Sequence, residues 1–274
     1  MYINRTVTRA ATAAALAAVL SMGAVQGATA SVPAGAPHQT AGKTVQATRP
    51  MDDGGGWHGD GLALNATDNR KVDAFLDRAR TSERSISPQV RAAALLSHAQ
   101  LVGFDHRLKS PDSLKRKVAT SLKESPGQTL DEALAKINDS VRYTLQWPDG
   151  TYSSGVVIAS TVLSEWRNDS VKWSNTWGRK KGYKAINSAW RAPRSGQVFE
   201  VQFHTPESKW AQEATHKLYE EQRLPSTSPE RARELQRQQD AIFASVPVPA
   251  GAKELTAPAP ALPVGARRAP APTR

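Results

Sequence analysis

The stretch FEVQFHT, Phe199–Thr205, alternates polar and bulky apolar side chains. Successive side chains of a strand point to opposite faces, so Glu200, Gln202 and His204 share one face while the apolar residues between them point to the core. A polar face of this kind either meets water or looks into an active site. The stretch alone predicts a strand and leaves both interpretations open.

Capping residues and apolar periodicity predict the elements around this strand. Four helices are expected before residue 140, with Thr67, Ser87, Ser110 and Thr129 near their starts. The run SVRYTLQW is expected to be a strand closed by Asp149-Gly150, followed by a helix over 155–166. SVKWSNTW, YKAINSAW and QVFEVQFHT indicate three more strands, and helices are expected over 206–223 and 228–244. The expected fold class is α/β (α+β), a mixed sheet flanked by helices.

The two ends of the chain differ in composition from the middle. Residues 1–30, with Arg5 and Arg9 before an Ala-rich apolar run, predict a signal peptide cleaved near Ala30 and hence a secreted protein. We expect a flexible leader over 31–64, a folded domain over 65–225, a C-terminal helix over 226–245, and a disordered Pro/Ala-rich tail over 246–274. No other apolar run is long enough to span a membrane.

Charge points to an anionic partner. The net charge is +11, and +9 once the two arginines of the signal are removed. Nucleotides, nucleic acids and bacterial surface polymers all fit this excess. The chain has no cysteine, which excludes disulfides and thiolate metal sites.

Cations cluster in two places. In RLKSPDSLKRK, Arg107 and Lys109 precede a helix that carries Ser113 and Lys117 one turn apart, a pattern that suits polyphosphate as well as a solvated basic helix start. In RKKGYKAIN, Gly182 permits close backbone approach and cations precede a tyrosine. Between these segments, an acid lies just before a strand; it fits either a helix stop or a magnesium ligand.

The order and spacing of these segments resemble the synthetase domain of the RelA/SpoT alarmone synthetases over about residues 66–225. The chain looks most like the secreted bacterial nucleotide 3′-pyrophosphokinases within that family. The resemblance implies a nucleotidyltransferase-like sheet and transfer of the β,γ-diphosphate of ATP to the 3′-hydroxyl of a purine nucleotide, giving products of the (p)ppGpp or (p)ppApp type. ATP, a purine nucleotide and Mg²⁺ are the implied ligands.

The resemblance also implies roles for matched positions. Glu200 would activate the acceptor hydroxyl and, with Asp139, hold Mg²⁺. The donor site for ATP would comprise Arg107, Lys109, Ser113 and Lys117, with Arg107 also packing on adenine. Tyr183 would stack on the acceptor base. The other implied acceptor-binding residues are Lys180, Lys181, Asn187, Gln202 and, more weakly, Glu213 and His216.

Departures from the family pattern keep alternatives open. Asn187 replaces the usual histidine and His204 the usual arginine, so a strict preference for guanine is in doubt. One alternative is toxin-like pyrophosphorylation of the tRNA 3′ end; another is a non-catalytic, secreted basic protein that binds nucleic acid or anions. A secreted metal-dependent nuclease lacks the paired-histidine spacing that would support it. The acceptor and the oligomeric state stay open.

Overall fold

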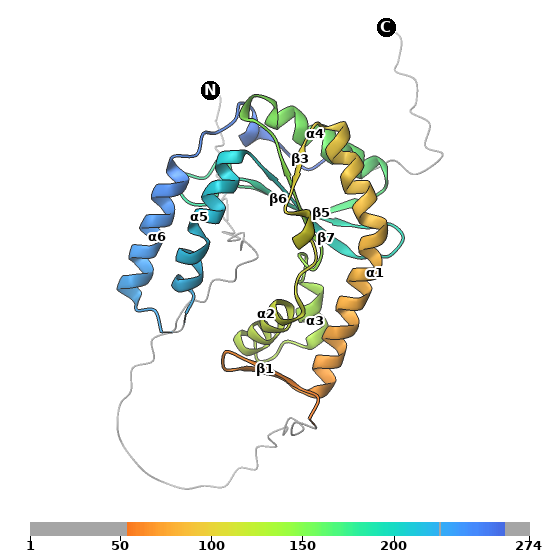
Figure 1. Cartoon of the computed structure of the whole chain (residues 1–274), viewed down its shortest axis with the longest axis vertical. Coiled ribbons are helices and arrows are strands. Elements are labelled where there is room, and N and C mark those ends of the chain that lie inside the picture. The colour runs from red at the N-terminus through yellow and green to blue at the C-terminus, as the bar shows by residue number, and fades with distance from the viewer. Residues whose placement is uncertain (1–53, 225, 261–274) are drawn as a thin grey trace, which may run out of the picture.

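The computed structural model describes residues 54–224 and 226–260, which fold around a five-stranded sheet (Figure 1). The strand order is β3-β4-β7-β6-β5, and β4 and β7 pair in parallel while all other neighbours are antiparallel. The strands are β3 (Gln100–Val102), β4 (Arg142–Gln146), β5 (Asp169–Asn175), β6 (Ile186–Arg191) and β7 (Val198–His204). The predicted mixed sheet and the four predicted strands are confirmed.

The register places the polar residues of neighbouring strands side by side. Arg142 of β4 lies opposite Glu200 of β7, and Asn187 of β6 lies opposite Gln202. The opposite face carries Tyr143, Val201, Phe203 and other large side chains of the main core. The sheet therefore has one apolar face and one polar face, as the alternation in β7 predicts.

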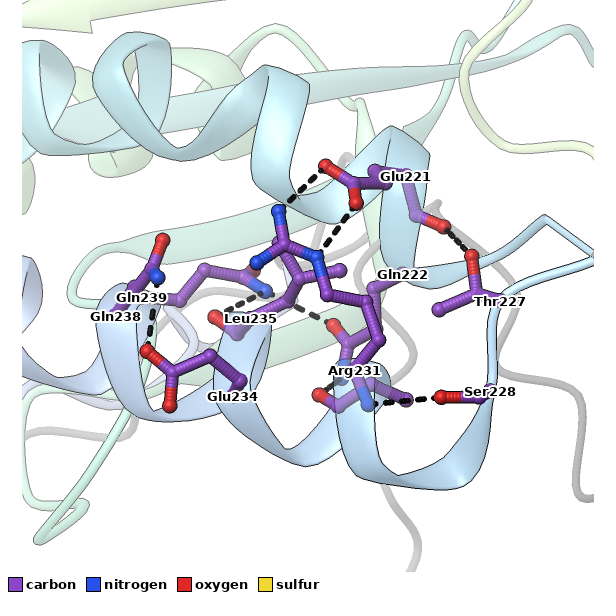
Figure 2. Close-up of polar contacts among 10 residues, drawn as sticks. Glu221, Gln222, Thr227, Ser228, Arg231, Glu234, Leu235, Gln238 and Gln239 are labelled. Atoms are coloured by element: carbon purple, nitrogen blue, oxygen red, sulfur yellow. Dashed lines mark hydrogen bonds and ion pairs between the residues drawn. The ribbon is translucent and has the colours of Figure 1, made fainter.

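Helices cover both faces of this sheet (Figure 1). The apolar face packs against α1 (Ala66–Leu96) and α4 (Asp149–Glu165). On the other side, α5 (Pro206–Gln222) and α6 (Pro229–Ala244) run as an antiparallel pair joined by the polar contacts drawn in Figure 2. The Asp149-Gly150 pair begins α4 and does not form the predicted turn.

The two predicted helices around residues 67–101 are one continuous helix, which corrects the expectation of a break at Ser87-Pro88. Asn65 caps α1 in place of Thr67, and Pro88 lies exposed within it. A proline inside a helix costs about 3 kcal/mol because one hydrogen bond is lost and the ring clashes with the carbonyl of the preceding turn. Burial on both sides of Pro88 offsets that cost, since Leu76 packs in a smaller core and Val90 in the main one.

A second, smaller core lies at one end of α1. It is formed with α2 (Pro111–Glu124) and α3 (Leu130–Ala135), both capped by the residues that the sequence predicts, although α3 ends before Asn138. A hairpin of β1 (Trp57–Gly59) and β2 (Leu62–Leu64) closes this core, with Leu64 buried. The predicted flexible leader is therefore wrong for residues 57–64; residues 1–53 lie outside the described residues.

The first part of the predicted disordered tail is folded. Residues 246–260 pack along α4 and β5 and include the short 3-10 helix η2 (Ala252–Glu254). Val246 and Ala252 are buried in the main core. A second 3-10 helix, η1 (Phe104–His106), leads into the segment before α2. Within the described ranges, no helix is long and apolar enough to cross a membrane.

Candidate active site

Asp139 lies between α3 and β4 and is held by two lysines. The Nζ of Lys117 donates to its Oδ1 at 2.8 Å, and the Nζ of Lys109 donates to its Oδ2 at 3.0 Å. The side chain is buried, and burial raises the pKa of Asp139; the two ammonium charges overcome that effect and hold the pKa at about 2. The carboxylate is therefore charged at every physiological pH.

Glu200 lies on the polar face of β7, the strand that pairs with β4, and Asp139 lies in the segment just before β4. Its backbone N–H donates to the carbonyl of Val141 at 2.9 Å, and its Oε1 accepts from Nε2 of Gln202 at 2.6 Å. Burial, together with the negative charge of Asp139, raises the pKa of Glu200, while Arg142 opposes the rise. Two carboxylates of similar chemistry thus have pKa values pushed in opposite directions, a pattern that general acid–base sites share.

These two carboxylates fit a magnesium site. Mg²⁺ binds through one or two carboxylates and completes its shell with water and phosphate oxygens. The raised pKa of Glu200 arises partly from the charge of Asp139, and a divalent cation between them would offset that repulsion. No larger group of three or more His, Asp or Glu side chains suited to a metal occurs in the described part of the chain.

The N-terminus of α2 does not form the expected polyphosphate cradle. The side chain of Ser110 accepts the N–H of Ser113, and Pro111 has no N–H to offer. Asp112 brings a carboxylate to the first turn, held there by Nε1 of Trp57 at 3.0 Å. Ser113 is exposed on this turn. The structure therefore brings Lys109 and Lys117 together around Asp139, with Ser113 outside that group.

Arg107 does not point to an open phosphate site. Its Nε donates to Oε1 of Glu83 at 2.5 Å, and its guanidinium lies 4.2 Å from the ring centre of Phe104. Arg91 stacks at the same distance on that ring. Glu83, which also accepts from Ser87, was not predicted; its signal in the sequence is a charge on the apolar stripe that carries Ile86 and Val90.

Tyr183 is a buried residue, contrary to the expectation of a ring open to an acceptor base. It is 4% exposed, and Phe243 of α6 packs edge-on against it with ring centres 5.7 Å apart. Its hydroxyl donates to Oδ1 of Asn187 at 2.9 Å and contacts Nε2 of His204 at 2.9 Å. Stacking of a base on Tyr183 therefore requires Phe243 to move.

His204 belongs to the same buried network. Its Nδ1 lies 2.8 Å from Oγ of Ser208, the residue that completes the capping box of α5. Burial, with Lys209 and Arg142 nearby, lowers the pKa of His204 to about 3, so the ring is neutral. The arginine expected from the resemblance is thus replaced by an uncharged ring that ties β7 to α5.

The remaining predicted residues are exposed. Lys180 and Lys181 lie on the loop between β5 and β6. On α5, His216 pairs with Glu220 at 3.2 Å and Glu213 pairs with Lys209 at 3.4 Å. Glu213 and His216 therefore pair with other residues of α5. The core of the candidate site is therefore Asp139, Glu200, Gln202, Lys109, Lys117 and the unpredicted Arg142.

The chain is similar in fold to small alarmone synthetases. The small alarmone synthetase 1 of Bacillus subtilis bound to its product pppGpp aligns with a TM-score of 0.45 at 13% identity, covering 64% of this chain and 91% of that chain. A second structure of that synthetase gives a TM-score of 0.44 at 14% identity over 63% and 91% of the two chains. A Streptococcus mutans protein gives 0.45 at 13% identity over 62% and 88%. No protein-family model and no curated protein matches the sequence.

The arrangement suits charge stabilisation on an oxyanion-rich substrate. Lys109, Lys117 and Arg142 place three cations around two carboxylates, one of which is neutralised by the two lysines. The group therefore has a net positive charge, which favours the binding of phosphate. Because Glu200 has a raised pKa, it can exchange a proton closer to neutral pH than an ordinary glutamate.

Proposed function

We propose that the protein is a secreted ATP:nucleotide 3′-pyrophosphokinase that uses a purine nucleotide as acceptor. The observation that carries the proposal is the placement of Asp139, just before β4, and Glu200, on the neighbouring strand β7, among Lys109, Lys117 and Arg142. Two carboxylates with opposed pKa shifts, set among cations, serve a transfer reaction on phosphates; simple anion binding has no need of them.

In the proposed reaction, the acceptor 3′-oxygen forms a bond to the β-phosphorus of ATP, and the bond from that phosphorus to the oxygen bridging to the α-phosphate breaks. AMP leaves with the electron pair of the broken bond, and the proton of the 3′-hydroxyl passes to Glu200. Lys109 and Lys117 offset charge on the transferred diphosphate and on AMP. Mg²⁺ bound by Asp139 and Glu200 would supply further charge neutralisation to the phosphate oxygens.

Gln202 and Arg142 position Glu200 for this role. Gln202 fixes one carboxylate oxygen through the 2.6 Å hydrogen bond, and Arg142 lies opposite Glu200 in the parallel register. The loop lysines Lys180 and Lys181 are exposed and available to acceptor phosphates. Tyr183 contacts the acceptor base in this proposal only after Phe243 is displaced.

The test is an acceptor screen. Purified protein is incubated with γ-labelled ATP, Mg²⁺ and one of AMP, GMP, ADP, GDP, ATP, GTP or tRNA. Label on the 3′ position of a purine nucleotide, lost on addition of EDTA, is the expected result. Label on tRNA alone would show that the acceptor is the tRNA 3′ end and not a free nucleotide. Intact ATP with every acceptor would favour the non-catalytic anion-binding alternative.

Secretion is the second part of the proposal and rests on residues 1–30. We expect the exported protein to begin near residue 31, which N-terminal sequencing of protein from the culture medium checks. Protein that stays in the cells with Met1 or Tyr2 at its N-terminus would contradict export.

A further inference from the structure

A cavity of about 650 Å³ lies apart from the residues of the candidate site. Its walls come from α1, from the end of α3 and the segment after it, and from the hairpin that joins β6 to β7. The volume is in the range of sites that hold small organic ligands. None of Asp139, Glu200, Lys109 and Lys117 lines it.

The charge of this cavity favours an anion. Arg78 and Arg191 both line it, and neither forms an ion pair within residues 54–224 and 226–260. The single carboxylate of the lining, Asp77, is paired with Arg80 at 2.9 Å. Two arginines therefore line the cavity, and the one carboxylate of the lining is already paired; one Nη of Arg191 also donates to the carbonyl of Gly196 at 3.3 Å. Guanidinium geometry matches phosphate oxygens well.

The rest of the wall favours a flat apolar group beside that anion. Phe75 is half-buried, and the guanidinium of Arg78 lies 5.8 Å from the centre of its ring. Val198, also half-buried, extends the apolar surface, whereas Leu134 and Ile137 line the cavity but are buried in the smaller core. An inorganic phosphate would contact the arginines and leave this surface facing water, whereas a nucleobase would cover it.

We propose that this cavity binds a phosphorylated nucleoside, with its phosphates on Arg78 and Arg191 and its base against Phe75. The proposal depends on the cavity alone and does not require the transfer reaction. The cavity and the candidate site share a wall, because Gln197 lines the cavity and its Nε2 donates to Oγ of Ser140 at 3.1 Å, next to Asp139. A test must therefore locate the bound nucleotide and not only detect binding.

Hydrogen exchange followed by mass spectrometry on the full chain provides that location, with ADP as the probe. We expect ADP to slow exchange in peptides covering 191–198 and 75–82, separately from any effect on 107–117. Arg78→Ala and Arg191→Ala should each raise the ADP concentration needed for half protection of 191–198 by at least about tenfold, the loss of one charge-assisted contact. Both side chains are exposed, so these variants should keep the native circular dichroism spectrum.

Arg194→Ala is the matched control, because it removes one charge from the same hairpin at a residue that does not line the cavity. It should leave protection of 191–198 by ADP unchanged. Protection that is absent in the native chain, or that Arg194→Ala weakens as much as Arg191→Ala does, would overturn the site. Equal protection by inorganic pyrophosphate and by ADP would overturn its assignment to a nucleotide. If ADP protects 191–198 from exchange but the protein transfers no label to any acceptor, the nucleotide site is supported and the proposed function is contradicted.

Discussion

Asp139 and Glu200 show how position decides the chemistry of a carboxylate. Both residues are 3% exposed, so burial acts on each carboxylate. Two lysines lie within hydrogen-bond distance of Asp139 and lower its pKa to about 2. Burial and the negative charge of Asp139 instead raise the pKa of Glu200. The charged form of Glu200 therefore opposes folding at pH values above the unfolded-state pKa of a glutamate.

Glu200→Gln should abolish transfer while leaving the protein at least as stable. We expect a loss on the order of 10³-fold or more in turnover if the base and metal roles coincide in this residue. Because the folded-state pKa is raised, removing the charge should increase the melting temperature at pH 8 and have little effect at pH 4, where the glutamate is protonated. Near-normal turnover, or a melting temperature that falls at pH 8, would contradict the assignment.

Tyr183→Phe should destabilise the protein without removing the buried ring. The change deletes a hydroxyl that contacts Asn187 and His204, and each lost hydrogen bond contributes about 1 kcal/mol. Urea unfolding followed by tryptophan fluorescence measures the loss. Asn187→Ala is the companion variant, since it removes one partner and keeps the other. Unchanged stability in both variants would show that this network does not support the fold.

At the scale of elements, the α5–α6 pair combines exposed polar contacts with a small apolar seam. Figure 2 shows Arg231 of α6 reaching Glu221 of α5 through both carboxylate oxygens, at 2.7 and 3.1 Å, and Gln239 bonding Gln222. Leu235 lies between the helices and is fully buried. Because exposed ion pairs are screened by water, the buried leucine should dominate the stability of the pair.

Leu235→Ala and Arg231→Ala separate these two contributions. Leu235→Ala should lower the free energy of unfolding by 2–5 kcal/mol, roughly the range for a leucine truncated in a core. Arg231→Ala should leave the urea midpoint nearly unchanged at 0.15 M salt, roughly physiological ionic strength. An effect of Arg231→Ala as large as that of Leu235→Ala would show that the ion pair holds α6 in place.

At the scale of the whole molecule, the segment after α6 ties the C-terminal end back to the sheet. Ser153 and Ser164 of α4 donate to the carbonyls of Ala250 and Ala259 at 2.6 and 2.8 Å, and Nδ2 of Asn175 on β5 donates to that of Ala252 at 2.7 Å. Four of the residues 246–260 are prolines, which have no N–H to donate, and carbonyls of this segment accept from the side-chain donors of α4 and β5. The segment also covers β5, the edge strand of the sheet.

Two truncations test this segment. A chain ending at Ser245 should lose stability, on the order of 3 kcal/mol or more, because Val246 is no longer buried and the side-chain hydrogen bonds from α4 and β5 are lost. A chain ending at Pro260 keeps all of these contacts and should unfold at the full-length urea midpoint. Equal stability of the two truncated chains would show that the segment does not contribute to the fold.

Local sequence was sufficient for the elements whose signals lie within the element. Ser110-Pro111, the TLDE capping box and the alternation of Phe199–His204 predicted α2, α3 and β7, because caps and side-chain period depend on neighbours in the chain. The same alternation placed Glu200 and Gln202 on one face. The spacing of basic residues also selected Lys109 and Lys117, both of which contact Asp139.

Tertiary structure decided what local signals could not. Pro88 predicted a break, yet packing in the two cores keeps α1 continuous. Gly- and Pro-rich composition predicted mobile ends, yet Leu64 and Ala252 are buried in the folded residues 57–64 and 246–260. Tyr183 was predicted to stack on a base, but Phe243, 60 positions away in the chain, packs against its ring. The sequence by itself determined most of the helices and strands, because those follow from local period and capping residues, and the family resemblance selected Asp139 and Glu200. Only the tertiary structure decided which side chains are buried and which charges meet, because burial and pairing depend on residues far apart in the chain.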